Sequence, residues 1–139
     1  MKTVGSGRLL LLLSLLFLSI PLLAKAVEES EEWHIPPQKA EVPNPLVSDQ
    51  TTIALGKKGY EAECRSCHGK SGKGDGPKAQ ELEKKIADLN SEKILGQTDG
   101  ALFWKISVGR KPMPAYKKLF TEEERWAVVI YIRQLCHSK

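Results

Sequence analysis

The sequence lacks most of the devices that stabilise small protein domains. It contains three cysteines among 139 residues, a number that is too small and odd for a disulfide framework. No segment shows the alternation of apolar and polar residues that is typical of a β-strand, and no internal repeat is visible. A chain of this length allows one domain with a small core. Such a core needs a further source of stability, and a metal or a large cofactor is the remaining candidate.

The charge balance gives no support for a nucleic-acid-binding protein. The whole chain carries a formal net charge of +4, but three of its basic residues, Lys2, Arg8 and Lys25, lie in the first 26 positions. Those 26 positions contain no acidic residue, so the remaining chain is nearly neutral. Overall basicity therefore gives no argument for binding to nucleic acid.

Residues 1–26 have the three parts of a secretory signal peptide. Lys2 and Arg8 form the charged n-region, residues 9–23 form an apolar h-region, and Ala24-Lys25-Ala26 is a cleavage site. Two serines and a proline interrupt the apolar run, which is short for a membrane span. We expect cleavage and export to the periplasm. Anchoring in the membrane by an uncleaved leader is the alternative.

Residues 27–47 form an acidic, proline-rich segment with five glutamates, four prolines and one lysine. This composition cannot bury enough apolar surface to fold alone. The segment is therefore expected to be a flexible strap ahead of a domain at residues 48–139. Trp33 is the candidate for pinning the strap to the domain. His34 is expected to be a solvated loop histidine, with a role as an extra metal ligand as the alternative.

From residue 48 onward the pattern is helical. Ser48 or Asp49 can cap a helix that reaches residue 64, and further short helices are expected over 78–85, 91–96 and 99–108. Four glycines in residues 69–76 predict a loop. Thr121 and Glu124 form a capping box that begins the last helix. The sum is an all-α domain of four to five short helices.

One motif carries chemistry. Cys64-Arg65-Ser66-Cys67-His68 is a C-x-x-C-H sequence, which attaches c-type haem. Thiols three positions apart can reach the two vinyl groups of one porphyrin, and the next residue can direct an imidazole at the iron. A single haem c bound in this way would become part of the covalent chain. A thiol redox site would instead need a βαβ context, and a zinc site would need Cys136 and His137 as a second ligand pair.

Met113 is the candidate for the opposite side of the iron. It is the only methionine besides Met1 and lies between Pro112 and Pro114, which exclude regular structure. Thioether ligation opposite histidine raises the potential of a haem and closes the iron to substrates. His34 and His137 are alternative ligands.

These elements, in this order, resemble the small bacterial class I c-type cytochromes over about residues 46–135. The first helix carries Gly56 and Tyr60, the glycine-rich loop follows the C-x-x-C-H motif, and Met113-Pro114 precedes a last helix with Tyr131. The resemblance implies a small class I cytochrome c fold around one covalently bound haem. It implies a one-electron carrier between periplasmic or membrane-associated redox partners, and not an enzyme. A dedicated electron-transfer subunit of a larger oxidoreductase is the first alternative, and an open-site haem enzyme or gas sensor is the second.

The same resemblance implies individual roles. Gly56 would let the first and last helices cross closely, with Tyr60 packed near Tyr131. The Pro77 carbonyl would accept a hydrogen bond from His68 Nδ1.

Two further residues, Leu102 and Trp104, would line the haem pocket, with ordinary core packing as the alternative. Cys136 lies outside the family pattern. It is expected to be a small helix residue, and an intermolecular disulfide is the alternative.

A group of cations surrounds Met113 in the sequence. Residues 48–139 contain 17 basic and 12 acidic residues, and no acidic residue lies between positions 105 and 118. We define the basic rim as Lys105, Arg110, Lys111, Lys117 and Lys118. It is a candidate docking surface for acidic redox partners, because complementary charge accelerates encounter. A solvated lysine face is the alternative.

Overall fold

The computed structural model of the protein describes residues 33–137, so the expected signal peptide lies outside the described residues. Within this range the α-helices are α1 (Pro37–Ala40), α2 (Gln50–Gly59), α3 (Arg65–His68), α4 (Glu92–Leu95), α5 (Asp99–Val108) and α6 (Glu122–His137). A π-helical turn, Tyr60–Cys64, joins α2 to α3, and 3₁₀ turns cover Pro77–Glu81 and Tyr116–Lys118. The all-α prediction is confirmed. No helix in this part of the chain is long and apolar enough to cross a membrane.

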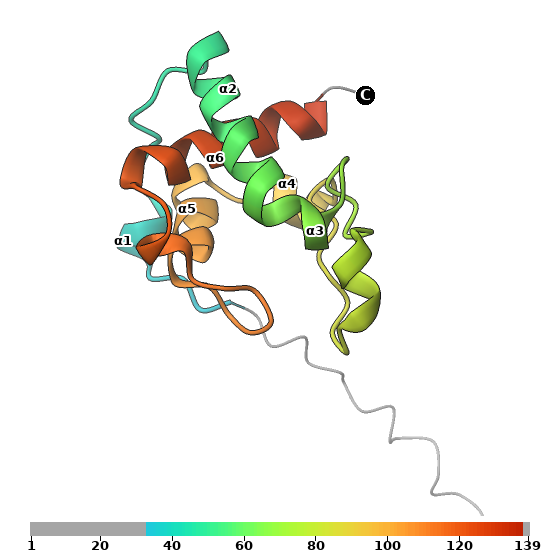
Figure 1. Cartoon of the computed structure of the whole chain (residues 1–139). Helices are drawn as coiled ribbons and strands as arrows, with labels where there is room; N and C mark the ends of the chain where they lie inside the picture. The colour runs from blue at the N-terminus through green and yellow to red at the C-terminus, as the bar shows by residue number, and fades with distance from the viewer. Residues whose placement is uncertain (1–32, 138–139) are drawn as a thin grey trace, which may run out of the picture. The chain divides into compact units, whose positions relative to one another are not determined.

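Helices α2 and α6 pack together and cross each other (Figure 1). A Cβ atom added to Gly56 would lie 2.0 Å from the carbonyl oxygen of Ala127, so only glycine permits this approach. One turn later, at the start of the π-helical turn, the ring of Tyr60 packs on that of Tyr131, with centroids 5.3 Å apart. Both expectations for this crossing are confirmed.

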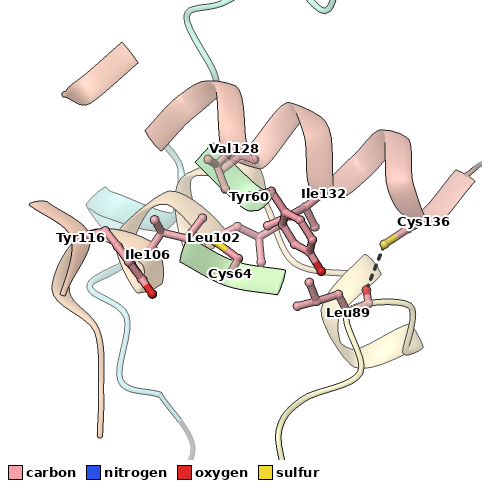
Figure 2. Packing of buried hydrophobic residues seen from close by; sticks show 10 residues of the cluster. Tyr60, Cys64, Leu89, Leu102, Ile106, Tyr116, Val128, Ile132 and Cys136 are labelled. Carbon is pink, nitrogen blue, oxygen red and sulfur yellow. Dashed lines mark hydrogen bonds between the residues drawn. The ribbon is translucent and has the colours of Figure 1, made fainter. Parts of the chain in front are cut away.

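The core lies where α5 packs beside this crossing. Figure 2 shows Tyr60, Val128 and Ile132 packed together, with Leu102 and Ile106 reaching in from α5. Tyr60 and Val128 are completely buried. Their burial fixes the position of the chain that follows Tyr60, which is the segment with the two cysteines of the motif.

Several helix ends agree with the sequence signals. Asp49 caps α2 in a reciprocal pair of hydrogen bonds with Thr52. The capping box of α6 is present: Thr121 N donates to Glu124 Oε2 over 2.8 Å, and Glu124 N donates to Thr121 Oγ1 over 3.2 Å. The expected helix at 78–85 is instead a 3₁₀ turn that begins at Pro77 and ends at Glu81.

Residues 33–47 differ from the expectation of a flexible strap. They contain α1 and run along α5 and the start of α6. Thr98 Oγ1 donates a hydrogen bond to the Ala40 carbonyl, and Asn44 Nδ2 donates to the Trp126 carbonyl over 3.3 Å. The segment is ordered by contacts with the rest of the domain. The composition of the segment alone does not reveal these contacts. Residues 27–32 lie outside the described range.

Candidate functional site

The C-x-x-C-H motif occupies the end of the long helical segment that begins with α2. Cys64 closes the π-helical turn and is buried, and Cys67 lies half-buried on α3. Gly69 ends α3 with a φ of 82°, a left-handed conformation that suits glycine. The buried hydroxyl of Tyr60 donates to the Gly69 carbonyl over 2.8 Å. The core thus holds both ends of the motif.

The imidazole of His68 is oriented by a backbone group. Its Nδ1 lies 3.3 Å from the carbonyl oxygen of Ala87. Because a carbonyl can only accept, Nδ1 carries the proton in this hydrogen bond, and Nε2 keeps a free lone pair for a metal. Burial lowers the pKa of His68, while the bond to Ala87 acts in the opposite direction. The neutral ring that burial favours is the form that binds iron.

The acceptor expected for His68 was Pro77, and this expectation is wrong in the structure. Pro77 is the first residue of a 3₁₀ turn, so its carbonyl is directed along that turn. The loop returns to the histidine ten residues later, where Ala87 supplies the carbonyl. Pro77 itself is exposed and does not line the cleft beside His68.

Met113 projects from a tight turn after α5. Arg110 and Met113 exchange two backbone hydrogen bonds of 3.0 and 2.9 Å, which close the turn around the two residues between them. Gly109 precedes the turn with a φ of 61°, and a Cβ there would lie 2.4 Å from the carbonyl of Pro114. The buried Tyr116 then donates its hydroxyl to the Glu63 carbonyl over 3.2 Å. The methionine loop is thereby tied to the turn that carries Cys64.

These segments enclose one cleft of about 350 Å³, measured with its open mouth. Its lining residues come from the motif, from the loop after it and from the methionine loop: Glu63, Cys64, Cys67, His68, Leu82, Ile86, Pro112, Met113, Pro114 and Tyr116. Both thiols, an imidazole with a free nitrogen and a thioether therefore share a largely apolar space. This donor set fits a c-type haem, with Cys64 and Cys67 to attach it and His68 and Met113 to ligate the iron.

The two other residues expected in the haem pocket lie elsewhere. Leu102 is buried in the core cluster with Cys64 and is not among the residues that line the cleft. Trp104 lines a separate cavity beside the strap, where Lys39 Nζ lies 6.0 Å from its ring centroid. Residues two positions apart on α5 point in nearly opposite directions, so Leu102 and Trp104 cannot both face the same space.

The remaining cysteine and the histidine of the strap lie away from the cleft. Cys136 is buried and its thiol donates to the Leu89 carbonyl over 3.3 Å (Figure 2). This position agrees with a small helix residue and leaves the sulfur inaccessible to another chain. His34 is exposed on the strap and does not line the cleft. The side chain of His137 lies outside the described part of the chain.

The basic rim lies around the methionine loop, and its members are not equivalent. Arg110, Lys111, Lys117 and Lys118 are exposed, whereas Lys105 is half-buried with its Nζ 2.6 Å from Gln97 Oε1. Trp33 packs against two of these cations. Its ring lies 5.5 Å from Lys105 Nζ and 4.8 Å from Arg110 Cζ, so the strap is pinned to the rim at this residue.

Sequence reasoning missed several groups that shape the site. The Ala87 and Glu63 carbonyls have no side-chain signature, so their roles leave no trace in the sequence. Leu82 and Ile86 read as ordinary apolar residues. The role of Tyr116 could have been predicted from the sequence. A tyrosine three positions after the candidate ligand Met113 can donate a hydrogen bond that fixes the loop.

Known proteins resemble this chain in sequence and in structure. The family model described as Cytochrome C oxidase, cbb3-type, subunit III matches residues 51–132. Among solved structures, a chain of the Kuenenia stuttgartiensis reducing HAO-like protein complex is 29% identical, with a TM-score of 0.59. The alignment covers 76% of this chain and 52% of that chain, so this chain spans about half the length of its structural relative. No curated protein is significantly similar to the sequence.

The matched segment contains the C-x-x-C-H motif, the methionine loop and most of α6, and it covers more than half of the chain. The family agrees with the resemblance to class I c-type cytochromes, and c-type cytochromes hold their haem by covalent attachment. The chain therefore belongs to the family of Cytochrome C oxidase, cbb3-type, subunit III, whose domain is a class I c-type cytochrome.

Proposed function

We propose that this protein is a one-electron carrier of the periplasm, with a single haem attached to Cys64 and Cys67. The observation that carries the proposal is that His68 and Met113 line the same cleft as the two thiols. The haem, when bound, supplies a reversible one-electron couple. Two supports for this role are the mainly apolar lining of the cleft and the presence of two ligand side chains, which together would leave the iron no open position for a substrate.

The chain's own residues hold this site in a fixed geometry. The Ala87 carbonyl orients the His68 ring, and the bond from Tyr116 to Glu63 holds the methionine loop against the attachment motif. Pro112 and Pro114 flank Met113 and limit the backbone freedom of the loop. A site that changes little between two oxidation states suits electron transfer, because little reorganisation accompanies each step.

The Met113 ligation is tested by substituting Met113 and, separately, the alternative ligand His34 in protein matured with the haem attachment machinery. In Met113→Ala we expect the weak far-red charge-transfer band of sulfur-ligated ferric haem to disappear and the reduced protein to bind carbon monoxide. The matched variant His34→Gln should keep the band and exclude carbon monoxide. A wild-type protein that binds carbon monoxide rapidly would support the open-site alternative and contradict the proposal.

Covalent attachment is tested separately by mass spectrometry under denaturing conditions. The wild-type chain should carry the added mass of one haem. The double variant Cys64→Ser, Cys67→Ser should have the mass of the bare polypeptide. A wild-type chain of bare mass after correct maturation would refute the proposed attachment.

We assign docking of acidic redox partners to the basic rim. Four of its cations are exposed around the loop that carries Met113, which borders the cleft. A concentration of one sign of charge near the redox site steers partners of opposite charge toward it. This steering weakens as salt screens the charges, which makes it measurable.

A second candidate is an electron-transfer subunit of a larger complex. The structural relative belongs to a reducing HAO-like protein complex and is about twice as long as the part covered here. The strap of residues 33–47 would then contribute part of the contact surface. Size-exclusion chromatography of the natively expressed protein separates the two functions, because a free carrier elutes as a monomer and a subunit elutes with a stoichiometric partner.

A further inference from the structure

A second cavity lies between the strap, α5 and the first turn of α6. Its volume is about 310 Å³, and it shares no lining residue with the haem cleft. Val42 of the strap forms one side and Gly100 of α5 another. The cavity is within the size range of small-molecule sites in proteins, about 300–1,000 Å³. Its walls and its charges together indicate what it binds.

Aromatic rings form much of its wall. Phe103 and Trp126 stack with centroids 3.9 Å apart and an interplanar angle of 12°. Trp104, which neither the core nor the haem cleft uses, also lines the cavity. Flat aromatic walls favour a ligand with a planar apolar part.

Arg125 brings a buried positive charge to this wall. Its residue is only 6% exposed, its Nε donates to the Thr121 carbonyl, and its Nη1 donates to Ser107 Oγ. The guanidinium also lies 4.8 Å from the centroid of Phe103. Within residues 33–137, no carboxylate lies within ion-pair distance of Arg125. A buried guanidinium is costly unless an anion compensates it, and the part of the chain that the structure describes supplies no such anion.

Two lysines strengthen the positive field. Lys39 from the strap and Lys117 from the 3₁₀ turn line the cavity and are exposed. Glu122 is the only carboxylate among the lining residues. The cavity therefore combines three cations with one anion, which favours a negatively charged ligand.

We propose that this cavity binds a small organic anion in which a carboxylate is attached to a planar aromatic ring. The carboxylate pairs with Arg125, since a guanidinium offers paired donors that match its two oxygens. The ring lies against the indole of Trp104, beside the stacked pair of Phe103 and Trp126. This site shares no residue with the haem cleft and only Lys117 with the basic rim, so benzoate binding is tested separately from the proposed function.

Benzoate is the probe for a direct test with the full, haem-bearing protein. The chain has three tryptophans, whose indole N–H signals are resolved in ¹H–¹⁵N spectra of ¹⁵N-labelled protein. Saturable benzoate binding should shift the signals of Trp104 and Trp126, while Trp33, which does not line the cavity, serves as internal control. Neutral benzamide, of the same shape, should bind at least tenfold more weakly.

Substitutions of single cations test which positive charges bind the carboxylate of benzoate. Arg125→Gln should weaken benzoate binding at least tenfold, because the buried partner of the carboxylate is lost. Lys117→Gln should weaken it by about threefold, whereas Lys118→Gln, its exposed neighbour outside the cavity, should not. Lys117→Gln keeps the test decisive if Arg125→Gln fails to fold. Absence of saturable shifts, equal binding of benzamide, or equal effects of Lys117→Gln and Lys118→Gln would overturn the proposal.

Discussion

Two buried tyrosine hydroxyls hold the attachment motif from opposite ends. Tyr60 donates to the Gly69 carbonyl just after His68, and Tyr116 donates to the Glu63 carbonyl just before Cys64. Burial is the main cause that raises the pKa of both phenols above their ordinary value of 10.0. Each hydroxyl therefore stays protonated, and remains a donor, over the whole physiological range.

Replacing Tyr60 with phenylalanine should change the pH dependence of stability. The folded pKa lies above the unfolded value of 10.0, so the stability linked to Tyr60 is complete below pH 10 and declines as pH rises further. The decline has an upper limit of about 1.4 kcal/mol per pH unit for each such tyrosine. At pH 7, Tyr60→Phe should be about 1 kcal/mol less stable than wild type because a hydrogen bond is lost.

Denaturant unfolding of both proteins between pH 7 and pH 11 checks this, since the stability gap should narrow above pH 10. Two parallel curves over the whole range would show that Tyr60 ionises equally in both states.

Gly56 permits the crossing of α2 and α6, and its substitution by alanine should force the helices apart. The added Cβ would lie 2.0 Å from the Ala127 carbonyl oxygen and 2.9 Å from Tyr131 Cβ, neither of which can move freely. We expect a loss of about 1–3 kcal/mol in the free energy of unfolding, typical of overpacking. Urea denaturation measures it. Gly96→Ala is the control, because Gly96 is exposed at the end of α4 and has an αR backbone that alanine adopts readily. Equal stability of the two variants would contradict the close approach.

Among the elements, the strap is the one whose packing most affects the surface. Its backbone runs so close to α5 that a Cβ on Gly100 would lie 2.4 Å from the Lys39 carbonyl oxygen and 2.7 Å from that of Ala40. The strap also contributes Lys39 and Val42 to the second cavity, and its Trp33 packs against two cations of the basic rim. One short segment therefore bears on both surfaces outside the haem cleft.

Gly100→Ala should displace the strap while leaving the domain folded. The backbone carbonyls of the strap would have to withdraw from α5, which exposes the chain around Lys39. Limited trypsin digestion should then cleave after Lys39 several-fold faster than in wild type. Far-UV circular dichroism should keep its helical signal. Cleavage at the wild-type rate would mean that residues 33–47 are no more tightly packed in wild type than in the variant.

On the scale of the whole molecule, the haem cleft and the second cavity are lined by different residues. The haem cleft opens beside the basic rim, while the second cavity lies between α5, α6 and the strap. Lys117 is the residue common to the rim and the second cavity. Partner docking and ligand binding are therefore separable by their readouts, with the rate of electron transfer for one and indole shifts for the other.

The double variant Lys111→Glu, Lys117→Glu should slow electron transfer to an acidic redox protein by about tenfold at low ionic strength. The effect should fade at high salt, because exposed charges are screened beyond about 10 Å at 0.1 M. The matched control is Lys57→Glu, Lys58→Glu, which makes the same charge change on α2, away from the residues that line the haem cleft. Stopped-flow kinetics measures all three proteins. Equal slowing in both variants, or none, would assign the docking surface elsewhere.

Much of the fold could be predicted from local patterns. The helical class, the capping box at Thr121 and the end of α5 at Gly109 follow from residue types within a few positions of one another. The close crossing at Gly56 joins remote helices, and it was expected only from the resemblance to class I c-type cytochromes. The haem attachment motif is equally local, because both thiols and the imidazole lie within five consecutive residues.

Only the tertiary structure decided which distant segments meet. The acceptor of His68 is the Ala87 carbonyl, a backbone group that no residue type announces. The orientation of α5 decided that Trp104 faces the strap, and the ordering of residues 33–47 depends on partners supplied by α5 and α6. The burial of Arg125 also depends on the packing of several elements. The sequence determined the local conformations and the chemistry of the motif, because these depend on neighbouring residues, whereas contacts between remote segments depend on how the whole core packs.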